Sequence, residues 1–170
     1  GGGNYDIAGA SATGPCGSAF DVTRWAGGSS SGSGAATALG CVGYSLGSET
    51  AGSILCPSAF NGLTGFRATF GRVSCHGAMA LAWSLDKIGP LCRSVDDAAI
   101  VLTAISGHDP KDPNTIPAKL DLRAKGPKPR IGLLKETFDK NKAADCEKAY
   151  NDAVALFRKL GYETVEIAWP

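Results

Sequence analysis

Two glycine- and serine-rich loops are the part of this sequence that could do chemistry. They occupy residues 27–34 and 47–53, and the stretch between them has the pattern of one short helix and one short strand. Glycine permits positive φ and close approach of the backbone to a ligand, and it weakens a helix or strand by about 0.5–1 kcal/mol per residue. So many glycines and serines in two tight clusters indicate a shaped site rather than a packed core.

The second loop has two of the parts that an acyl-transfer site needs. Such a site requires a nucleophile, a base that takes its proton, and hydrogen-bond donors aimed at the oxyanion. Ser53 opens a predicted helix, and the small residues Ala51 and Gly52 let successive backbone N–H groups converge on one point. Loss of one such donor typically raises a barrier by about 2.7–4 kcal/mol. Serine is also a preferred N-cap residue, which gives Ser53 a purely structural interpretation as well.

The first loop carries a competing motif. Gly28-Ser29-Ser30-Ser31-Gly32 satisfies G-x-S-x-G, which would make Ser30 the nucleophile of an esterase of the α/β-hydrolase type. That arrangement needs a buried strand directly before the serine, and residues 21–25 are polar for a central strand. A flexible Gly/Ser linker is the structural alternative. The alanine-rich segment and apolar strand that follow at once argue against a linker.

Isolated histidines and scattered cysteines give no sign of a metal site. His76 and His108 have no ligand-type neighbours at suitable spacing, and Lys87 is typical of a surface or structural lysine. The six cysteines, which form no C-x-x-C pair, are Cys16, Cys41, Cys56, Cys75, Cys92 and Cys146. We therefore expect free thiols, a reducing and hence cytoplasmic setting, no metal and no cofactor.

The two loops resemble the signature of the amidase signature family of serine hydrolases. The resemblance is carried by G-G-S-S-S-G-S at residues 27–33 and G-S-E-T-A-G-S-I-L-C-P at residues 47–57. It continues through G-F-R-A-T-F-G-R-V-S at residues 65–74, S-L-D-K-I-G-P at residues 84–90 and R-S-V-D-D at residues 93–97. Such an extended match is far more specific than a single glycine motif.

The resemblance implies hydrolysis of carboxylic amides, with esters as further candidates, by a Ser–Ser–Lys triad. Ser53 matches the nucleophile, and Ser29 matches the bridging serine, which in the family follows a cis peptide bond, here Gly28–Ser29. The backbone N–H groups that match the oxyanion hole belong to Thr50, Ala51, Gly52 and Ser53. The residues in supporting positions are Gly28, Ser30 and Glu49.

The sequence departs from the family pattern in ways that leave a second interpretation open. The family's lysine lies well upstream of the bridging serine, and no lysine precedes Lys87 here. Leu55 stands where the family has arginine and Glu49 where it commonly has aspartate, so we expect another partner for Glu49, such as Arg67. Family members are several times longer than this match. We therefore also consider a truncated, catalytically incomplete amidase fragment that binds ligands or subunits.

Alternating strands and helices predict an α/β fold with a mixed, mostly parallel sheet flanked by helices. The predicted helices cover residues 33–42, 53–60, 94–105 and 145–160, and the predicted strands cover residues 42–46, 63–68, 130–134 and 162–167. Three parts follow: a glycine/serine-rich signature core at 1–106, a proline-rich surface connection at 107–129, and a β-α-β unit of the same sheet at 130–170.

Composition limits the partners that this chain could bind. Charged residues make up 19% of the sequence and the formal net charge is +1, with no basic run. Nothing electrostatic therefore favours nucleic acid or an anionic membrane surface, and no apolar run approaches the ~20 residues that span a bilayer. A truncated α/β chain leaves sheet edges and apolar surface uncovered. We expect a small-molecule amide or ester substrate and a homo-oligomer.

Overall fold

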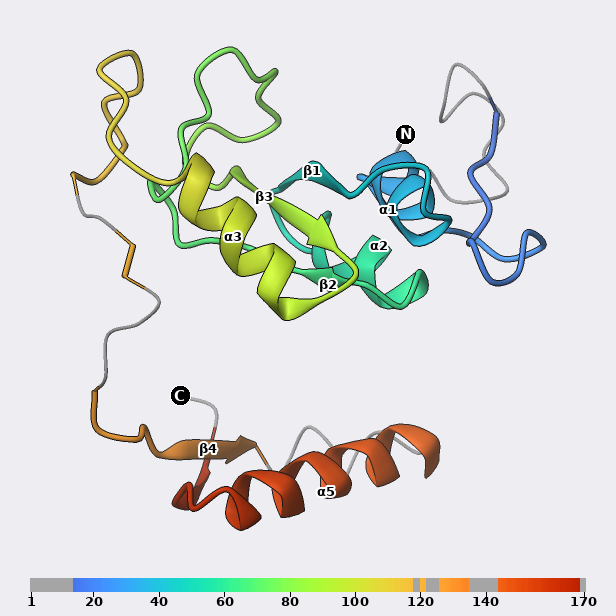
Figure 1. Ribbon diagram of the computed structural model, residues 1–170, viewed down its shortest axis with the longest axis vertical. Helices are drawn as coiled ribbons and strands as arrows, with labels where there is room; N and C mark the ends of the chain where they lie inside the picture. Colours follow the sequence, from blue (N-terminus) through green and yellow to red (C-terminus); the bar gives the residue numbers. More distant parts are fainter. Residues whose placement is uncertain (1–13, 118–119, 122–125, 135–143, 169–170) are drawn as a thin grey trace. The chain divides into compact units, whose positions relative to one another are not determined.

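The computed structural model describes residues 14–117, 120–121, 126–134 and 144–168 (Figure 1). The chain divides into two compact units, Gly1–Leu122 and Arg123–Pro170. Residues 1–13 of the predicted signature core and parts of the predicted connection at 107–129 lie outside the described residues.

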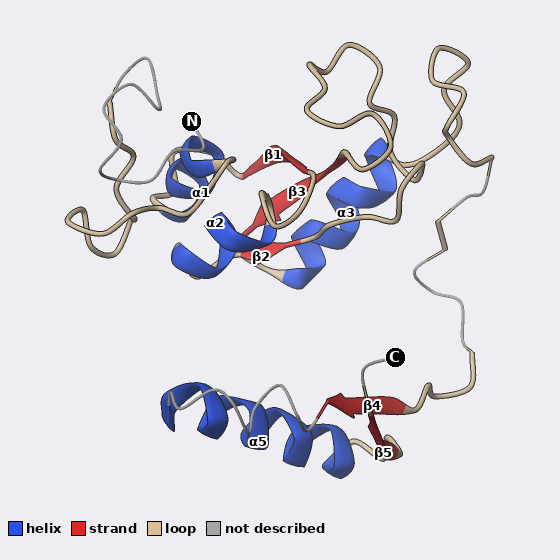
Figure 2. Ribbon diagram, turned by 180° about the vertical axis from the view of Figure 1, so that it is seen from behind, coloured by secondary structure: helices blue, strands red, loops and turns tan. Residues whose placement is uncertain are grey.

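A three-stranded antiparallel sheet forms the centre of unit 1 (Figures 1 and 2). Its order is β1-β3-β2, with β1 at Tyr44–Glu49, β3 at Lys87–Cys92 and β2 at Thr64–Gly65. The sequence pattern did not predict the central strand β3. Its Pro90 lacks an N–H donor, which disfavours an interior strand, yet the strand pairs on both sides and Pro90 lies opposite Leu46.

Three helices pack on this sheet. α1 (Ser31–Ala38) contacts β1 and β3, α2 (Leu55–Phe60) contacts β2, and α3 (Val95–Ile105) runs beside β3 and β2. α1 begins before the predicted 33–42, and it also ends earlier, because Gly40 turns the chain with a φ of +76°. α3 agrees with the prediction: the Ser94 hydroxyl accepts a hydrogen bond from the N–H of Asp97, as an N-cap does.

The buried apolar residues of unit 1 lie largely where α3 meets the sheet. One cluster contains Ala68, Val73 and Leu102, and a second contains Cys92, Ala98 and Val101. Ile105 packs against both clusters. Of the six cysteines, all free thiols as expected, only Cys92 is buried.

Asn61 fastens the segment before α1 to the end of α2. Its side chain is fully buried and donates from Nδ2 to the carbonyl oxygens of Ala26 at 2.7 Å and Pro57 at 2.8 Å. Its Oδ1 accepts a hydrogen bond from the N–H of Ala19 at 2.9 Å. One amide side chain thus satisfies donors and acceptors that the fold would otherwise bury without partners.

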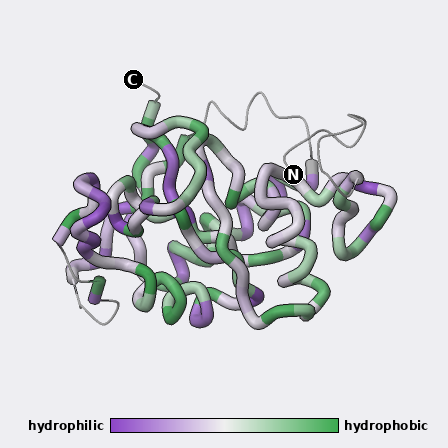
Figure 3. The backbone as a smooth tube through the Cα atoms, turned by 90° about the horizontal axis from the view of Figure 1, so that it is seen from above, coloured by the Kyte–Doolittle hydropathy of each residue, from purple (hydrophilic) through white to green (hydrophobic). Residues whose placement is uncertain are grey.

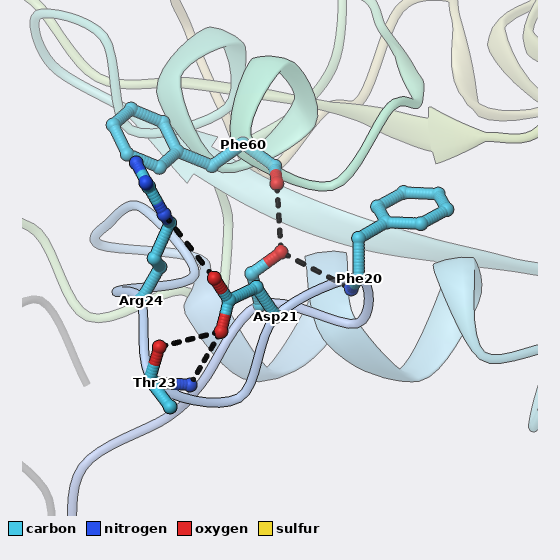
Figure 4. A network of polar contacts seen from close by, with 6 residues as sticks. Phe20, Asp21, Thr23, Arg24 and Phe60 are labelled. Atoms are coloured by element: carbon cyan, nitrogen blue, oxygen red, sulfur yellow. Dashed lines mark hydrogen bonds and ion pairs between the residues drawn. The ribbon is translucent and has the colours of Figure 1, made fainter.

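A second set of polar contacts lies close to Asn61 and closes the turn at residues 18–24 (Figure 4). The Ser18 hydroxyl donates to the carbonyl oxygen of Phe60 at 2.9 Å. The Asp21 carboxylate accepts from the hydroxyl of Thr23 at 2.6 Å and from Nε of Arg24 at 3.2 Å. The loop that leads into the first serine cluster is therefore anchored at several points on α2 and on itself.

Unit 2 is a strand, a helix and a strand. β4 (Ile131–Leu134) and β5 (Thr164–Ile167) pair in parallel, and α5 (Ala144–Lys159) lies between them in the sequence. Gly161, with a φ of +78°, ends the helix, as the sequence pattern predicts. The prediction that this unit belongs to the same sheet as residues 1–106 stays a prediction.

The sequence pattern predicts one mixed, mostly parallel sheet, whereas the described strands of unit 1 pair antiparallel and those of unit 2 pair in parallel. Because β1 and β2 are both antiparallel to β3, they run in the same direction as each other, on either side of α2 in the sequence. The predicted order of a strand at 42–46, a helix at 53–60 and a strand at 63–68 is therefore confirmed. β3 lies between the two strands, and the parallel pairing among the described residues is that of β4 with β5.

No helix in the described part of the chain is long and apolar enough to cross a membrane. Figure 3 shows hydrophobic and hydrophilic stretches alternating along the backbone.

Replacing the buried Asn61 should destabilise unit 1. Asn61→Ala leaves the N–H of Ala19 and the carbonyl oxygen of Ala26 without their partner, and each such group costs about 1–3 kcal/mol. We expect the free energy of unfolding to fall by about 3 kcal/mol, measured by urea denaturation with tryptophan fluorescence. The control Asn151→Ala, on the exposed surface of α5, should stay within about 0.5 kcal/mol of wild type. Equal effects of the two substitutions would contradict the role of Asn61.

Candidate active site

The fold brings the two serine loops together. The backbone N–H of Ser30 donates to the carbonyl oxygen of Ser53 at 3.2 Å. The hydroxyl of Ser30 donates to the carbonyl oxygen of Ser48 at 3.4 Å. Ser29 is exposed and Ser53 is half-buried, so both hydroxyls belong to residues that solvent can reach. Direct contact between the Ser29 and Ser53 hydroxyls stays a prediction.

Backbone geometry around the first loop depends on glycine. Gly27 is buried with a φ of +76°, and a Cβ there would lie 2.6 Å from the Cα of Pro57. Only glycine allows the loop to approach the start of α2 this closely. The next peptide bond, Gly28–Ser29, is cis, as the family resemblance implies.

Ser30 lies at the N-cap of α1 and not in a strand-to-helix elbow. Residues 18–24 form turns and bends, and the described residues ahead of Ser30 contain only an isolated bridge between Gly17 and Trp25. The esterase alternative therefore loses the buried strand on which it depends.

The second loop presents free backbone donors. Residues 50–54 connect β1 to α2, and Gly52 has a φ of +113°. In the part of the chain that the structure describes, no acceptor takes a hydrogen bond from the N–H groups of Ala51, Gly52 or Ser53. Free N–H groups around a half-buried serine are what an oxyanion hole requires.

The buried Glu49 side chain holds the end of this loop, where α2 begins. Its side chain is 2% exposed, and Oε2 accepts hydrogen bonds from the N–H groups of Ile54 at 2.8 Å and Leu55 at 3.0 Å. A carboxylate at these positions also complements the partial positive charge of the α2 N-terminus. Nε of Arg67 lies 3.9 Å from Oε1, which confirms Arg67 as the expected partner of Glu49.

Thr50 is held from two sides by residues that the sequence analysis did not assign to the site. Its hydroxyl donates to Oδ1 of Asp86, and its carbonyl oxygen accepts a hydrogen bond from Nζ of Lys87 at 3.0 Å. Lys87 is 8% exposed and therefore structural, not a surface residue. The sequence signal was the polar pair inside the S-L-D-K-I-G-P motif.

Asp86 is tied to a loop of its own as well as to Thr50. Its Oδ2 accepts from the N–H groups of Leu81 at 2.7 Å and Ala82 at 3.0 Å. The hydrogen bond from the Thr50 hydroxyl, helped by these N–H groups and by the charge of Lys87, holds the pKa of Asp86 below its usual value. The carboxylate is therefore ionised at neutral pH and accepts every one of these bonds.

A cavity of about 340 Å³ adjoins Asp86. Its apolar walls include Phe70, Met79 and Trp83, and His76 and Asp112 add polar groups. Neither Ser29 nor Ser53 lines it. Ser48 of the second loop lines it, and so does Asp86, which holds Thr50. The cavity therefore borders the second loop but not the hydroxyls of Ser29 and Ser53.

The cavity's titratable groups do not form a catalytic or metal-binding cluster. Burial, together with the charges of Asp112 and Asp86, raises the pKa of the Cys75 thiol and so disfavours its thiolate. Among the described residues no group of three or more histidine, cysteine or acidic side chains could hold a metal ion.

This arrangement defines a class of protein: an α/β chain with two apposed serine loops and free backbone donors. The family model described as Amidase matches residues 8–170. The chain therefore belongs to the amidase (amidase signature) family, as the resemblance indicated.

Similar proteins include amidotransferase subunits and amidases. A glutamyl-tRNA(Gln) amidotransferase subunit from Ligilactobacillus salivarius is 47% identical over 156 residues, which are 89% of this chain and 32% of that protein. The crystal structure of the corresponding amidotransferase subunit from Thermotoga maritima matches with a TM-score of 0.87 and 35% identity, over 94% of this chain and 36% of that one. Native peptide amidase of Stenotrophomonas maltophilia matches with a TM-score of 0.77 and 36% identity, over 91% and 33%. These structures confirm the α/β fold, and the chain spans about a third of the length of the relatives it matches.

Acid should weaken unit 1 partly through Asp112. Its carboxylate accepts hydrogen bonds from the N–H of Cys75 at 2.8 Å and from the backbone and side chain of Asn114, and these lower its pKa. Because the folded pKa lies below the unfolded one, the stabilisation is present above the ordinary aspartate pKa of about 3.9 and is lost as pH falls through the folded value. Stability measured by urea unfolding should therefore decline less between about pH 6 and about pH 3 in Asp112→Asn than in wild type.

Asn114→Ala removes one of the three donors to Asp112 and should reduce the same decline by a smaller amount. Identical pH dependence in wild type and Asp112→Asn would show that Asp112 contributes nothing to acid sensitivity.

Proposed function

We propose that this chain carries the serine loops of an enzyme that hydrolyses carboxylic amides through an acyl-enzyme on Ser53. The observation that carries the proposal is the free N–H set at Ala51, Gly52 and Ser53, next to a loop that the hydrogen bond from Ser30 to Ser53 fixes in place. Membership of the amidase family and similarity to peptide amidase and aryl acylamidase structures support C–N bond cleavage.

Ser53 and Ser29 have distinct roles in the proposed reaction. Oγ of Ser53 attacks the amide carbonyl carbon and passes its proton to Oγ of Ser29, while Ser29 passes its own proton to the amide nitrogen. The oxyanion receives hydrogen bonds from the 50–53 backbone. Collapse of the intermediate breaks the C–N bond, and the amine leaves with the proton that Ser29 donated. Water then attacks the acyl carbon, its proton passes through Ser29 back to Oγ of Ser53, and the carboxylic acid leaves.

A second candidate function is binding without turnover. The family's base is a lysine upstream of the bridging serine, and residues 1–86 contain no lysine. Lys87 cannot replace it where it stands, because its Nζ donates to the Thr50 carbonyl oxygen. For the 170 residues printed here, these two observations favour ligand binding at the same loops without turnover.

Hydrolysis of a small aryl amide and a p-nitrophenyl ester tests the proposal. Ser53→Ala should lower kcat/KM by about 10³-fold or more, because it removes the bond-forming atom, and Ser29→Ala by about 10²-fold. A fluorophosphonate probe should add its mass to Ser53 in the wild-type chain and in Ser106→Ala, and to neither position 53 nor position 106 in Ser53→Ala. Ser106→Ala is the matched control, because the buried Ser106 hydroxyl has no hydrogen-bond partner in the described part of the chain.

Each other outcome has a definite meaning. Full activity in Ser53→Ala with loss in Ser30→Ala would restore the esterase alternative. No turnover of either substrate and no labelling of Ser53 would favour the incomplete amidase core.

We also propose that the chain self-associates. Large apolar side chains are exposed, among them Met79 at 99% and Trp83 at 84%, and exposed apolar surface of this kind favours association. Sedimentation velocity at increasing concentration should show a species heavier than the monomer. A single monomeric boundary at all concentrations would contradict this proposal.

A further inference from the structure

The second loop is fastened more firmly at Thr50 than local chain geometry requires. Two polar groups of this residue are engaged by distant side chains: Asp86 accepts from its hydroxyl and Lys87 donates to its carbonyl oxygen. Asp86 and Lys87 are 36 and 37 residues away in the sequence. Thr50 immediately precedes the free N–H groups of residues 51–53. The orientation of its carbonyl group fixes the plane of the peptide unit that contains the N–H of Ala51.

The charges involved are held in place by their own surroundings. Lys87 lies at the start of the central strand β3, in the register position opposite Glu49, and is buried at 8% exposure. The N–H groups of Leu81 and Ala82 orient the Asp86 carboxylate from the other side. Burying an ammonium group costs free energy unless the group is hydrogen-bonded. The hydrogen bond from Lys87 to the Thr50 carbonyl oxygen offsets part of this cost and holds the carbonyl group in place.

We propose that Asp86 and Lys87 are positioning residues that aim the N–H groups of Ala51, Gly52 and Ser53. This inference rests on the proposed function, in which those N–H groups bind the oxyanion. Neither side chain touches the reacting atoms. They act through Thr50, and their effect falls on the transition state rather than on ground-state binding.

Four substitutions in the full chain separate positioning from bulk stability. Thr50→Val removes the hydroxyl, and Thr50→Ser restores it. Asp86→Asn leaves a single acceptor oxygen, which cannot serve both Thr50 and the N–H groups of Leu81 and Ala82. Lys87→Met removes the ammonium group and keeps an aliphatic chain of similar length. Thr103→Val on α3 and Lys148→Met on α5 are the matched controls, because their polar groups bond within their own helices.

The first readout does not need turnover. Order parameters of the backbone N–H groups of residues 51–53, from ¹⁵N relaxation, should fall from about 0.85 to below about 0.6 in Thr50→Val, Asp86→Asn and Lys87→Met. Thr50→Ser and the two controls should stay near about 0.85. The N–H groups of Ile54 and Leu55, bonded to Glu49, should keep their protection from hydrogen exchange and so report an intact fold.

The second readout is the split between kcat and KM for the aryl amide. The three disruptive variants should lose at least about 10-fold in kcat with KM within about 2-fold of wild type, and Thr50→Ser should recover most of the loss. Order parameters near the wild-type value in Asp86→Asn and Lys87→Met overturn the inference, with or without turnover. So does a wild-type kcat in those two variants when Ser53→Ala abolishes hydrolysis. If instead the order parameters fall as expected while Ser53→Ala keeps full activity, the positioning role stands and the proposed function fails.

Discussion

The buried carboxylate of Glu49 is the interaction on which the second serine loop depends. It ends β1, accepts two N–H groups at the start of α2, and lies 3.9 Å from the Arg67 guanidinium. An ionised group at 2% exposure is stable only when hydrogen bonds and opposite charge replace its lost hydration. Because one side chain links the strand to the helix, the short connection between them has few ways to relax.

The charged residues around this loop work as a set. Glu49 and Lys87 occupy opposite positions on β1 and β3, and both bond to backbone groups of residues 50–55. Asp86 then holds the Thr50 side chain. Backbone donors and acceptors near the loop are thus satisfied by side chains, while the N–H groups of residues 51–53 stay available within the described structure.

Sequence patterns predicted the elements whose signals are local. Ser94 as an N-cap, Gly161 as a helix end and the β-α-β order of unit 2 follow from residue types at neighbouring positions, and the structure confirms them. β3 was missed because its pairing partners are distant in sequence and Pro90 disguises it. The mostly parallel sheet was expected for the same reason, since the antiparallel β3 between β1 and β2 was not foreseen.

The candidate site shows the same division. The serine loops and Glu49 could be found from composition and family resemblance, and Arg67 as its partner from charge alone. The roles of Asp86, Lys87 and Asn61 could not be found in this way. Each of these side chains makes a hydrogen bond to a residue at least 35 positions away in the sequence. A backbone carbonyl leaves no mark in the sequence that identifies which side chain will reach it.

The close approach of the two loops limits how this site can change over evolutionary time. A Cβ at Gly47 would lie 2.6 Å from the hydroxyl oxygen of Ser30, so even alanine there would collide with the opposite loop. A larger residue at position 47 therefore requires a change at position 30. Lineages that alter substrate preference are consequently expected to do so through surrounding segments, and engineering libraries that randomise one loop alone should return few folded members.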